Sequence, residues 1–300
     1  MMSPPAIFCR ATIIRGVLCV LAGILSAESG LERHLFAQDN SVFQSPTVLP
    51  QSRAHAHNDY QHPRPLMDAL AEGFCSVEAD IFLVNGELLV AHEPSELSPQ
   101  RTLEALYLNP LRKRIREMGG RVYPQGPQFT LLIDFKLEGA PTYEVLRKQL
   151  ERYREMLVPQ AGSPLGLDGR PSAAVQIVIS GNRPIAAIQN DPERLVGIDG
   201  RLSDLDTTLS ADLMPMISDR WPTHFRWRGQ GSFPAQEREH LRRVVEQAHA
   251  AGRRIRFWAT PELPVVWDVL LAAGVDHINT DQLIKLRMHL NNQNPSAAKN

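Results

Sequence analysis

The sequence predicts an α/β fold, a single (β/α)8 TIM barrel, and three observations predict it. A chain of 300 residues with 43% hydrophobic composition can bury one large core, and such a barrel commonly takes about 250 residues. From Arg53 onward, short apolar runs alternate with amphipathic stretches, as they do in parallel βα units. Polar residues recur where the apolar runs end, and barrels place their active sites at the carboxyl ends of the strands.

The individual elements follow from the period of the hydrophobic residues. Strands are expected at Arg53–His57, Ser76–Leu83, Phe129–Phe135, Ala174–Ser180, Leu195–Ile198, Leu213–Ile217, Arg254–Ala259 and His277–Asn279. Helices are expected at Pro65–Glu72, Thr102–Met118, Thr142–Met156, Pro184–Asn190, Ala235–Ala251, Pro264–Ala273 and Asp281–Asn291. The pattern is weakest in the fifth and sixth units. Residues 53–291 should therefore form one barrel without an inserted domain, and the Pro- and Gly-containing segment Pro159–Pro171 should be a loop.

The first 27 residues have the pattern of a targeting segment. Arg10 and Arg15 precede the apolar stretch Gly16–Leu25, and the first acidic residue, Glu28, comes only afterwards. This pattern predicts a signal peptide or an uncleaved signal anchor over residues 1–27, followed by a linker over residues 28–52. The barrel would then be exported, periplasmic or secreted, with membrane association through the leader if it stays uncleaved. Residues 292–300 should form a disordered tail.

Charge and cysteine content narrow the partners. The formal net charge of −1 provides no global basic field, so no nucleic-acid partner is expected, although a local phosphate site needs only a few charges. Beyond the leader, Cys75 is the single cysteine. One thiol makes no internal disulfide, and its place at the start of an apolar strand predicts a buried structural thiol. These features leave the oligomeric state open.

The densest group of chemically useful residues lies between Arg53 and Pro94. His57 and Asn58 end the first expected strand. Glu78 and Asp80 alternate with apolar residues in the second strand, so both project from one face. Two carboxylates in apolar surroundings cost free energy unless a cation or protons neutralise them, and no adjacent basic residue lies on either strand. Oxygen ligands of this kind favour one divalent cation, Mg²⁺ or Ca²⁺.

Histidines flank the carboxylates. His92 follows the apolar run Leu88–Ala91, and with His57 it could perform general acid–base chemistry on a bound ester. His55 lies two residues before His57 and shares its face. His55 is therefore a hydrogen-bonded strand residue, a substrate contact, or the catalytic imidazole in place of His57.

Later strand ends add further polar residues. Asp134 and Lys136 share a face, so they either pair with each other or serve the ion and the substrate separately. Asn182 follows the fourth strand in an ordinary turn or as a substrate contact, and Trp258 is either core packing or a wall of the pocket. An aromatic rim suited to a lipid or glycosyl group could come from Tyr60, Trp221, Phe225 and Trp227.

Several of these motifs resemble those of a known superfamily. Five elements of glycerophosphodiester phosphodiesterases have similar counterparts here. The E-x-D and H-D elements resemble Glu78-Ala79-Asp80 and His92-Glu93, and the E-x-K element resembles Asp134-Phe135-Lys136. The late V-x-W-T and G-V-D-x-I-x-T-D elements resemble the segments 255–260 and 274–281. His57-Asn58-Asp59-Tyr60 is similar to the H-N-x-Y start of phosphoinositide-specific phospholipases C. The chain thus resembles the PLC-like phosphodiesterase superfamily. Within it, H-A-H-N-D-Y, S-V-E-A-D and L-L-V-A-H-E-P most resemble the altered inheritance of mitochondria protein 6 family, and the likeness covers residues 53–290.

The resemblance implies a metal-dependent phosphoric diester hydrolase that acts on a glycerophosphodiester or (lyso)phospholipid-like substrate. The roles it implies are His57 and His92 as the catalytic acid–base pair, Asn58, Glu78, Asp80 and Asp134 as metal ligands, and His55, Lys136, Asn182 and Trp258 as substrate-binding residues. The chain also departs from the glycerophosphodiesterase pattern. The H-R-G start and the E-N-T turn are absent, and Asp134 stands where the longer Glu is usual. These departures leave the substrate open.

Other functions fit parts of the pattern. One is a non-catalytic secreted barrel that binds metal or phosphate, but pure binding does not require an acid–base pair such as His57 and His92. Another is metal-dependent hydrolysis of a sugar or an amide, although the site lacks the His-rich ligands typical of such enzymes. Within the superfamily, a phospholipase D-like or lyase action on lysolipids also fits.

Overall fold

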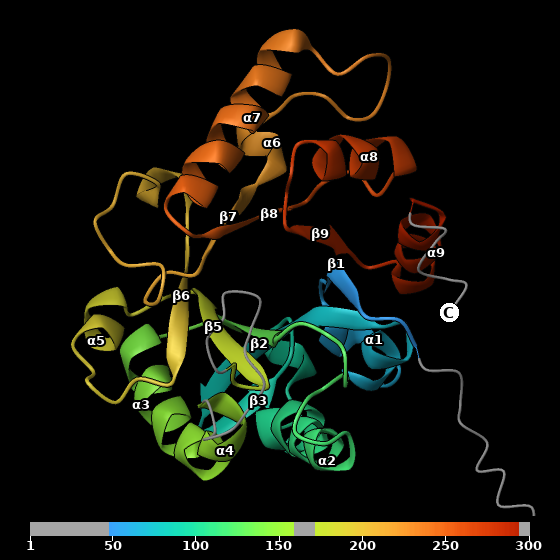
Figure 1. Ribbon diagram of the computed structural model, residues 1–300. Coiled ribbons are helices and arrows are strands. Elements are labelled where there is room, and N and C mark those ends of the chain that lie inside the picture. Colours follow the sequence, from blue (N-terminus) through green and yellow to red (C-terminus); the bar gives the residue numbers. More distant parts are fainter. Residues whose placement is uncertain (1–47, 159–171, 294–300) are drawn as a thin grey trace, which may run out of the picture. The chain divides into compact units, whose positions relative to one another are not determined.

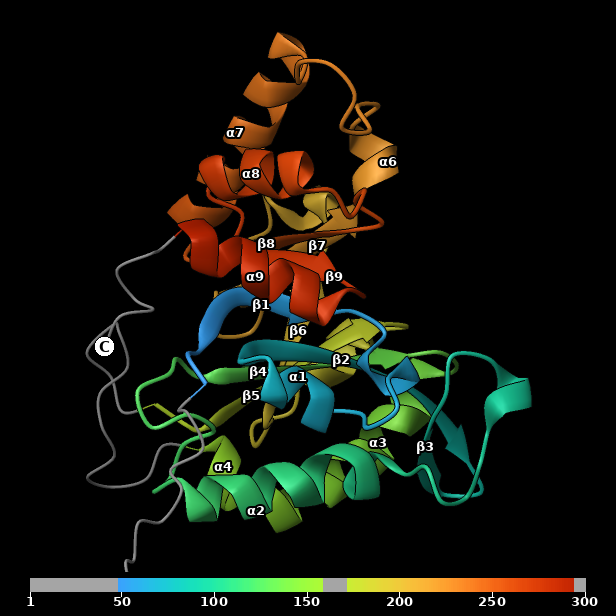
Figure 2. The same cartoon turned by 90° about the vertical axis from the view of Figure 1, so that its right-hand side faces the viewer.

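Eight parallel strands close into a barrel (Figure 1; Figure 2). They are β1 (Gln51–Ala56), β2 (Phe74–Val84), β4 (Phe129–Phe135), β5 (Val175–Gly181), β6 (Val196–Gly200), β7 (Met216–Arg220), β8 (Arg254–Trp258) and β9 (His277–Thr280). β1 closes the sheet because it pairs with both β2 and β9, with His55 opposite Ser76 on one side and Asn279 on the other. The computed structural model describes residues 48–158 and 172–293. The expected leader, most of the linker, the loop 159–171 and the residues after Gln293 lie outside them. The predicted (β/α)8 fold is confirmed.

A hairpin that the sequence pattern did not predict extends β2. After Val84 the chain turns through Asn85 and Gly86, both with positive φ, and returns as the antiparallel strand β3 (Glu87–Val90). Asn-Gly is the preferred pair for such a two-residue turn because both positions need φ above zero. The hairpin brings the chain back beside the middle of β2, where Ala91 N donates to Asp80 O at 3.2 Å. His92 therefore lies next to Asp80.

Helices surround the strands. They are α1 (Met67–Ala71), α2 (Asn109–Glu117), α3 (Gly139–Leu150), α4 (Arg154–Leu157), α5 (Ile185–Gln189), α6 (Trp221–His224), α7 (Ala235–Ala250), α8 (Pro264–Ala272) and α9 (Leu283–Gln293). A π-helical turn, Glu104–Leu108, leads into α2. The seven expected helices are all present, but the one expected at Thr142–Met156 is divided into α3 and α4 by the 3-10 turn Glu151–Tyr153, and α6 is an additional short helix. Within residues 48–158 and 172–293, no helix is long and apolar enough to span a bilayer.

One strand lies further along the chain than the sequence predicted. The sixth parallel strand was expected at Leu213–Ile217, but β7 begins three residues later, at Met216. Leu213 N donates to Ser210 O at 3.0 Å, so Leu213 still belongs to a turn, and Pro215 has no N–H to give to a ladder. β1 begins two residues earlier than expected, and its first residue pairs with the start of β2, since Gln51 N donates to Gly73 O at 2.7 Å.

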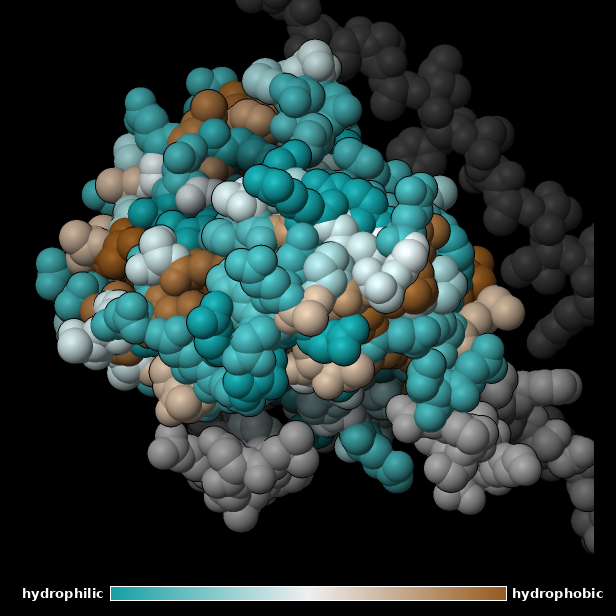
Figure 3. Space-filling view, turned by 90° about the horizontal axis from the view of Figure 1, so that it is seen from above, coloured by the Kyte–Doolittle hydropathy of each residue, from teal (hydrophilic) through white to brown (hydrophobic). Residues whose placement is uncertain are grey.

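The proposed aromatic rim is wrong, because its four residues are buried in the apolar core. Trp221 starts α6 and stacks on Phe225 with ring centroids 4.0 Å apart. The ring of Trp221 also packs edge-on against that of Phe257 on β8, with centroids 5.6 Å apart, and its Nε1–H donates to Trp227 O at 3.1 Å. Figure 3 shows one face of the molecule, which is mostly hydrophilic with hydrophobic residues in small groups. Cys75 is buried as expected, and burial raises the pKa of its thiol to about 12.

Candidate active site

Three carboxylates meet at the carboxyl ends of neighbouring strands. Glu78 and Asp80 come from β2, and Asp134 of β4 pairs directly with Asp80 in the ladder. Each of the three offers an oxygen within 4.8 Å of the others. Glu78 and Asp80 are buried, and Asp134 is half-buried. Like charges this close are unfavourable in a low-dielectric setting unless cations compensate them.

Asp80 binds all of its partners through one oxygen. Its Oδ2 accepts from Tyr60 Oη at 2.5 Å, Lys136 Nζ at 2.7 Å and His92 Nδ1 at 3.0 Å. Its Oδ1 is buried and has no hydrogen-bond partner among the described residues. Burial and the charge of Glu78 raise the pKa of Asp80, against the opposing effect of Lys136. A buried, unpartnered carboxylate oxygen beside two further carboxylates fits a divalent cation, since all the donors are hard oxygens.

Glu78 forms an ion pair across the barrel. Arg256 of β8 places Nη1 at 3.0 Å from Glu78 Oε2. Burial alone would raise the pKa of Glu78, but Arg256 and His55 bring it well below its ordinary range. The sequence offered no adjacent basic partner because the partners come from other strands. Arg256 and Lys136 together face three carboxylates, so one negative charge of the cluster stays uncompensated by protein cations.

The carboxylate of Asp134 lies next to Gly181, the last residue of β5. Gly181 has φ of +67°, and a Cβ at this position would lie 1.9 Å from Asp134 Oδ1. A side chain at residue 181 would therefore displace the carboxylate. Burial raises the pKa of Asp134 to about 6, although Lys136 opposes this shift. Lys136 Nζ is 3.8 Å from Asp134 and 2.7 Å from Asp80, so Asp80 is its main partner.

The two predicted catalytic histidines are held in the same way. His57 Nδ1 lies 2.8 Å from Asp281 Oδ1, and His92 Nδ1 lies 3.0 Å from Asp80 Oδ2. Donation from Nδ1 to a carboxylate leaves Nε2 as the nitrogen of each ring that can transfer a proton. Nε2 of His92 lies 4.0 Å from Glu93 Oε1. Burial lowers the pKa of His57, but Asp281 and Glu78 outweigh it and the net pKa is raised. Both rings are partly solvent-exposed, 24% for the His57 side chain and 43% for that of His92.

His55 lies beneath this pair and is fully buried. Its Nδ1 contacts Ser76 Oγ at 2.7 Å, and its Nε2 contacts Arg256 Nη1 at 2.6 Å. Burial and the charge of Arg256 lower the pKa of His55 to about 4, which keeps the ring neutral at pH 7. The structure therefore places His55 where it contacts Glu78 and Arg256 rather than solvent. This placement favours His57 over His55 as the acid–base group.

Asn58 and Tyr60 connect the first strand to the cluster. Asn58 has the left-handed backbone conformation, φ 48°, and turns the chain two residues after the end of β1. Its Oδ1 lies 2.6 Å from Tyr60 Oη, so this oxygen and Asp80 Oδ2 are alternative acceptors for the one hydroxyl proton of Tyr60. Tyr60 Oη also lies 2.9 Å from His92 Nδ1. The hydroxyl of Tyr60 thus touches Asn58, Asp80 and His92 at once.

The remaining predicted residues lie at the same end of the barrel. Asn182 follows β5, is exposed, and donates from Nδ2 to Lys136 O at 3.1 Å. Trp258 ends β8 and is half-buried, with the guanidinium carbon of Arg201 5.0 Å from its ring centroid. The sequence analysis gave no role to Arg256 or Asp281, although both lie in the motifs of the last two strands, and it placed Tyr60 in an aromatic rim rather than beside the carboxylates. A basic residue inside the apolar run of β8 was the available signal for Arg256.

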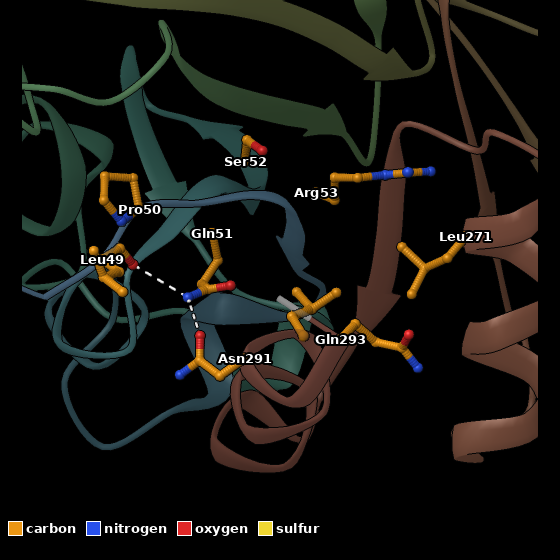
Figure 4. A pocket seen from close by; sticks show the side chains of 9 residues that line it. Leu49, Pro50, Gln51, Ser52, Arg53, Leu271, Asn291 and Gln293 are labelled. Carbon is orange, nitrogen blue, oxygen red and sulfur yellow. Dashed lines mark hydrogen bonds between the residues drawn. The ribbon is translucent and has the colours of Figure 1, made fainter. Parts of the chain in front are cut away.

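Two cavities lie beside the barrel rather than over the carboxylates. One, of about 370 Å³, surrounds the start of β1, where Gln51 Nε2 donates to Asn291 Oδ1 at 2.8 Å and to Leu49 O (Figure 4). Because the histidines follow the other end of β1, this cavity is at the opposite end of the strand. The second, of about 830 Å³, follows α9 and reaches Asp281.

Comparisons with known proteins agree with the fold and the motifs. Residues 45–196 match the AIM6-like phosphodiesterase domain, and residues 254–284 match the glycerophosphoryl diester phosphodiesterase family. Altered inheritance of mitochondria protein 6 of Eremothecium gossypii is 30% identical over 266 residues, 77% of this chain and 68% of that protein. Its homologue from Arthroderma benhamiae is 26% identical over 301 residues, 88% and 93% of the two chains.

A solved structure shares the fold. It is a calcium-dependent phosphoinositol-specific phospholipase C from Pseudomonas sp., with a TM-score of 0.54 and 14% identity over 80% of this chain and 95% of that one. The barrel, the motifs and the domain match together confirm the resemblance drawn from the sequence. The chain therefore belongs to the altered inheritance of mitochondria protein 6 family and carries its phosphodiesterase-type barrel.

Proposed function

We propose that the protein is a metal-dependent phosphoric diester hydrolase that acts on a glycerophosphodiester or (lyso)phospholipid-like substrate. The observation that carries the proposal is the pair of partly exposed imidazoles, His57 and His92. Each is anchored at Nδ1 by a carboxylate, and they flank a cluster of three acids with an unpartnered buried oxygen. Phosphodiester cleavage needs charge neutralisation at the phosphoryl oxygens, a base for the attacking oxygen and an acid for the leaving oxygen.

The metal would be held by Glu78, Asp80 and Asp134, with Asn58 Oδ1 as a fourth ligand. When bound, a Mg²⁺ or Ca²⁺ ion supplies positive charge that polarises the phosphoryl group. Lys136 adds a fixed ammonium beside Asp80, which suits it to contact a phosphate oxygen. Asn182 and Trp258, which lie further round the same end of the barrel, would contact the alcohol part of the substrate.

The histidines would move the protons. One neutral imidazole takes the proton of the attacking oxygen at Nε2 as that oxygen bonds to phosphorus. The other, protonated, donates its Nε2 proton to the leaving alkoxide as the P–O bond breaks. If the attacking oxygen belongs to a neighbouring hydroxyl of the substrate instead of water, a cyclic phosphate forms first.

The competing function is a barrel that binds metal or phosphate without catalysis. Turnover of bis-(p-nitrophenyl) phosphate by the wild type and a His92→Ala variant, with calorimetric metal binding on both, separates the two. Catalysis predicts that the variant loses turnover by about 100-fold or more while it keeps metal affinity. No turnover by the wild type, with metal binding intact, would support the binding function.

The proposal includes export of the barrel. The leader pattern of residues 1–27 supports secretion or membrane anchoring, and either would bring the site to extracytoplasmic phosphodiesters or membrane lipids. Amino-terminal sequencing of the protein recovered from the medium, the periplasm or the membrane fraction tests this. Recovery of the chain with an intact Met1 in the cytoplasmic fraction would contradict it.

A further inference from the structure

An apolar groove begins at the candidate active site and runs along the outside of the barrel. The cavity of about 830 Å³ lies between α9 and the segment that leads into α1, two elements that lie side by side in both views (Figure 1; Figure 2). Asp281 and Gln282, which precede α9, line one end of it, and Asn292 of α9 lines it nearer the carboxyl end of the helix. Asp281 is also the residue that anchors His57 at 2.8 Å. The groove is therefore continuous with the reacting end of the barrel.

The apolar part of the groove comes mainly from α9. Ile284 and Met288 are four residues apart on this helix and share a face, and Leu283 and Ala71 line the groove beside them. Ile284 and Met288 are unusually exposed for large apolar residues, 58% and 55% respectively. Exposed apolar side chains that gather within a groove are typical of a binding site for an apolar group.

Polar groups lie where the groove meets the active site. His62 and Arg64 line it on the α1 side, and Asp281 and Gln282 line it on the α9 side. Charged and polar residues also line the rest of the groove beside Ile284 and Met288: Asp68, Glu72, Lys285, His289 and Asn292. The polar end near the histidines and the apolar strip of Ile284 and Met288 suit a molecule with a charged head and one hydrocarbon tail. The 11 residues of α9 correspond to a helix about 16 Å long at 1.5 Å per residue, which is long enough to line an extended alkyl chain.

We propose that this groove binds the single alkyl chain of the substrate, so that the enzyme prefers a lysophospholipid-like phosphodiester to a chain-free glycerophosphodiester. The inference rests on the proposed function, since it assigns the phosphodiester to the carboxylate and histidine cluster. The phosphate would lie at the cluster, and the chain would pass Asp281 and follow Ile284 and Met288 along α9.

The test is a chain-length series of lysophosphatidylcholines, assayed below their critical micelle concentrations, with bis-(p-nitrophenyl) phosphate as the chain-free substrate. We expect KM of the wild type to fall at least about tenfold between a short and a long chain, because each buried methylene adds favourable transfer free energy. The double variant Ile284→Glu/Met288→Glu should lose at least about tenfold in kcat/KM for the long chain relative to the chain-free substrate. The matched control is Met118→Glu, an exposed Met at the end of α2, which should keep the wild-type ratio.

A second measurement separates the groove from the chemistry. Decyl maltoside carries one alkyl chain and no phosphate, and its binding below the micelle concentration is measured by calorimetry. Binding by the wild type and by the Met118→Glu control, but not by the double variant, supports the groove even if no phosphodiester is turned over, which would overturn the proposed function alone. Turnover without chain-length preference, or a double variant that keeps the preference and binds the maltoside, overturns the groove alone. A wild-type dimer that becomes a monomer in the double variant would place a second copy of the chain there and likewise overturn it.

Discussion

Arg256 Nη1 lies 3.0 Å from Glu78 Oε2, although the two residues are 178 positions apart in the chain. The contact crosses the barrel from β8 to β2, and both side chains are almost completely buried. The Arg256 guanidinium also contacts His55 Nε2 and Asn279 Oδ1, so it connects β8 to β1, β2 and β9 beside the candidate metal site. Loss of Arg256 would leave the buried carboxylate of Glu78 without this opposite charge, which is costly in free energy.

Replacement of Arg256 by Met should lower the free energy of unfolding by about 3–5 kcal/mol, because Glu78 would remain buried without its partner. Urea unfolding in EDTA measures this. The matched control is Arg242→Met on α7, because the partners of Arg242, Glu239 and Glu246, are exposed. Its free energy of unfolding should fall by about 1 kcal/mol or less. Equal losses in the two variants would show that the buried pair contributes nothing special.

Gly181→Ala should disturb Asp134 directly. At a φ of +67°, the new Cβ would overlap Asp134 Oδ1 and would come within 2.9 Å of the backbone N of Phe135, so both the carboxylate and the end of β4 must move. Gly231→Ala is the matched control, since Gly231 has φ of +63° and nothing within 4 Å of the added Cβ. The free energy of unfolding of the control should fall by about 1 kcal/mol, because alanine is strained at a positive φ. That of Gly181→Ala should fall further, and this variant should also bind Mg²⁺ or Ca²⁺ at least about tenfold more weakly. Unchanged metal affinity in calorimetry would remove Asp134 from the ligand set.

Asp281→Asn should impair His57 without unfolding the barrel. Asn at this position cannot hold the imidazolium as a carboxylate does, so kcat should fall about 100-fold with a smaller change in KM. NMR titration should show a lower pKa for His57 than in the wild type. Because the pKa of His57 is higher in the folded chain than in the unfolded chain, protonation of this residue stabilises the fold at pH values below the unfolded pKa of about 6.5. That stabilisation is lost as the pH rises through the folded pKa. The variant should therefore lose stability mainly at acidic pH.

The control for this change is Asp268→Asn, which removes a carboxylate 2.9 Å from His289 on the outside of the barrel. It should leave kcat on bis-(p-nitrophenyl) phosphate and the pKa of His57 unchanged. A fall in kcat of similar size in both variants would mean that the effect of Asp281 is general rather than specific to His57.

The metal-free protein should lose stability as pH rises from about 4 to about 6. Burial raises the pKa of Asp134 to about 6 from its ordinary value of 3.8, so the native state binds more protons than the unfolded state in this window. The loss from this group should be about 2 kcal/mol. Thermal unfolding in EDTA across this range, for wild type and Asp134→Asn, measures it. Added Mg²⁺ or Ca²⁺ should restore stability to the wild type only, and a variant that responds equally to the ion would contradict the role of Asp134.

Much of the site could be predicted because its first members are local. The alternation Glu78-Ala79-Asp80 places both carboxylates on one face of any strand, and His57 and Asn58 needed only the end of an apolar run. Parallel strands then bring these ends together, which is why the barrel prediction also located the site.

The rest depends on contacts that no local pattern specifies. Arg256 meets Glu78 only because the barrel closes, and Asp281 meets His57 only because β9 pairs with β1. The position of His92 depends on the hairpin at Asn85 and Gly86, which returns the chain beside Asp80. The aromatic residues at 221, 225 and 227 failed as a rim because burial of their large apolar area outweighs exposure at a loop.

The central claim is that the barrel hydrolyses phosphodiesters with the help of a metal held by Glu78, Asp80 and Asp134. The most direct test is the rate of hydrolysis of bis-(p-nitrophenyl) phosphate by the purified protein, first with EDTA and then with Mg²⁺ or Ca²⁺ restored. Hydrolysis that stops with EDTA and returns with one of the ions, in the wild type but not in Glu78→Gln, is the predicted result. Neither turnover nor measurable metal binding in the wild type, or full activity in Glu78→Gln, would contradict the account.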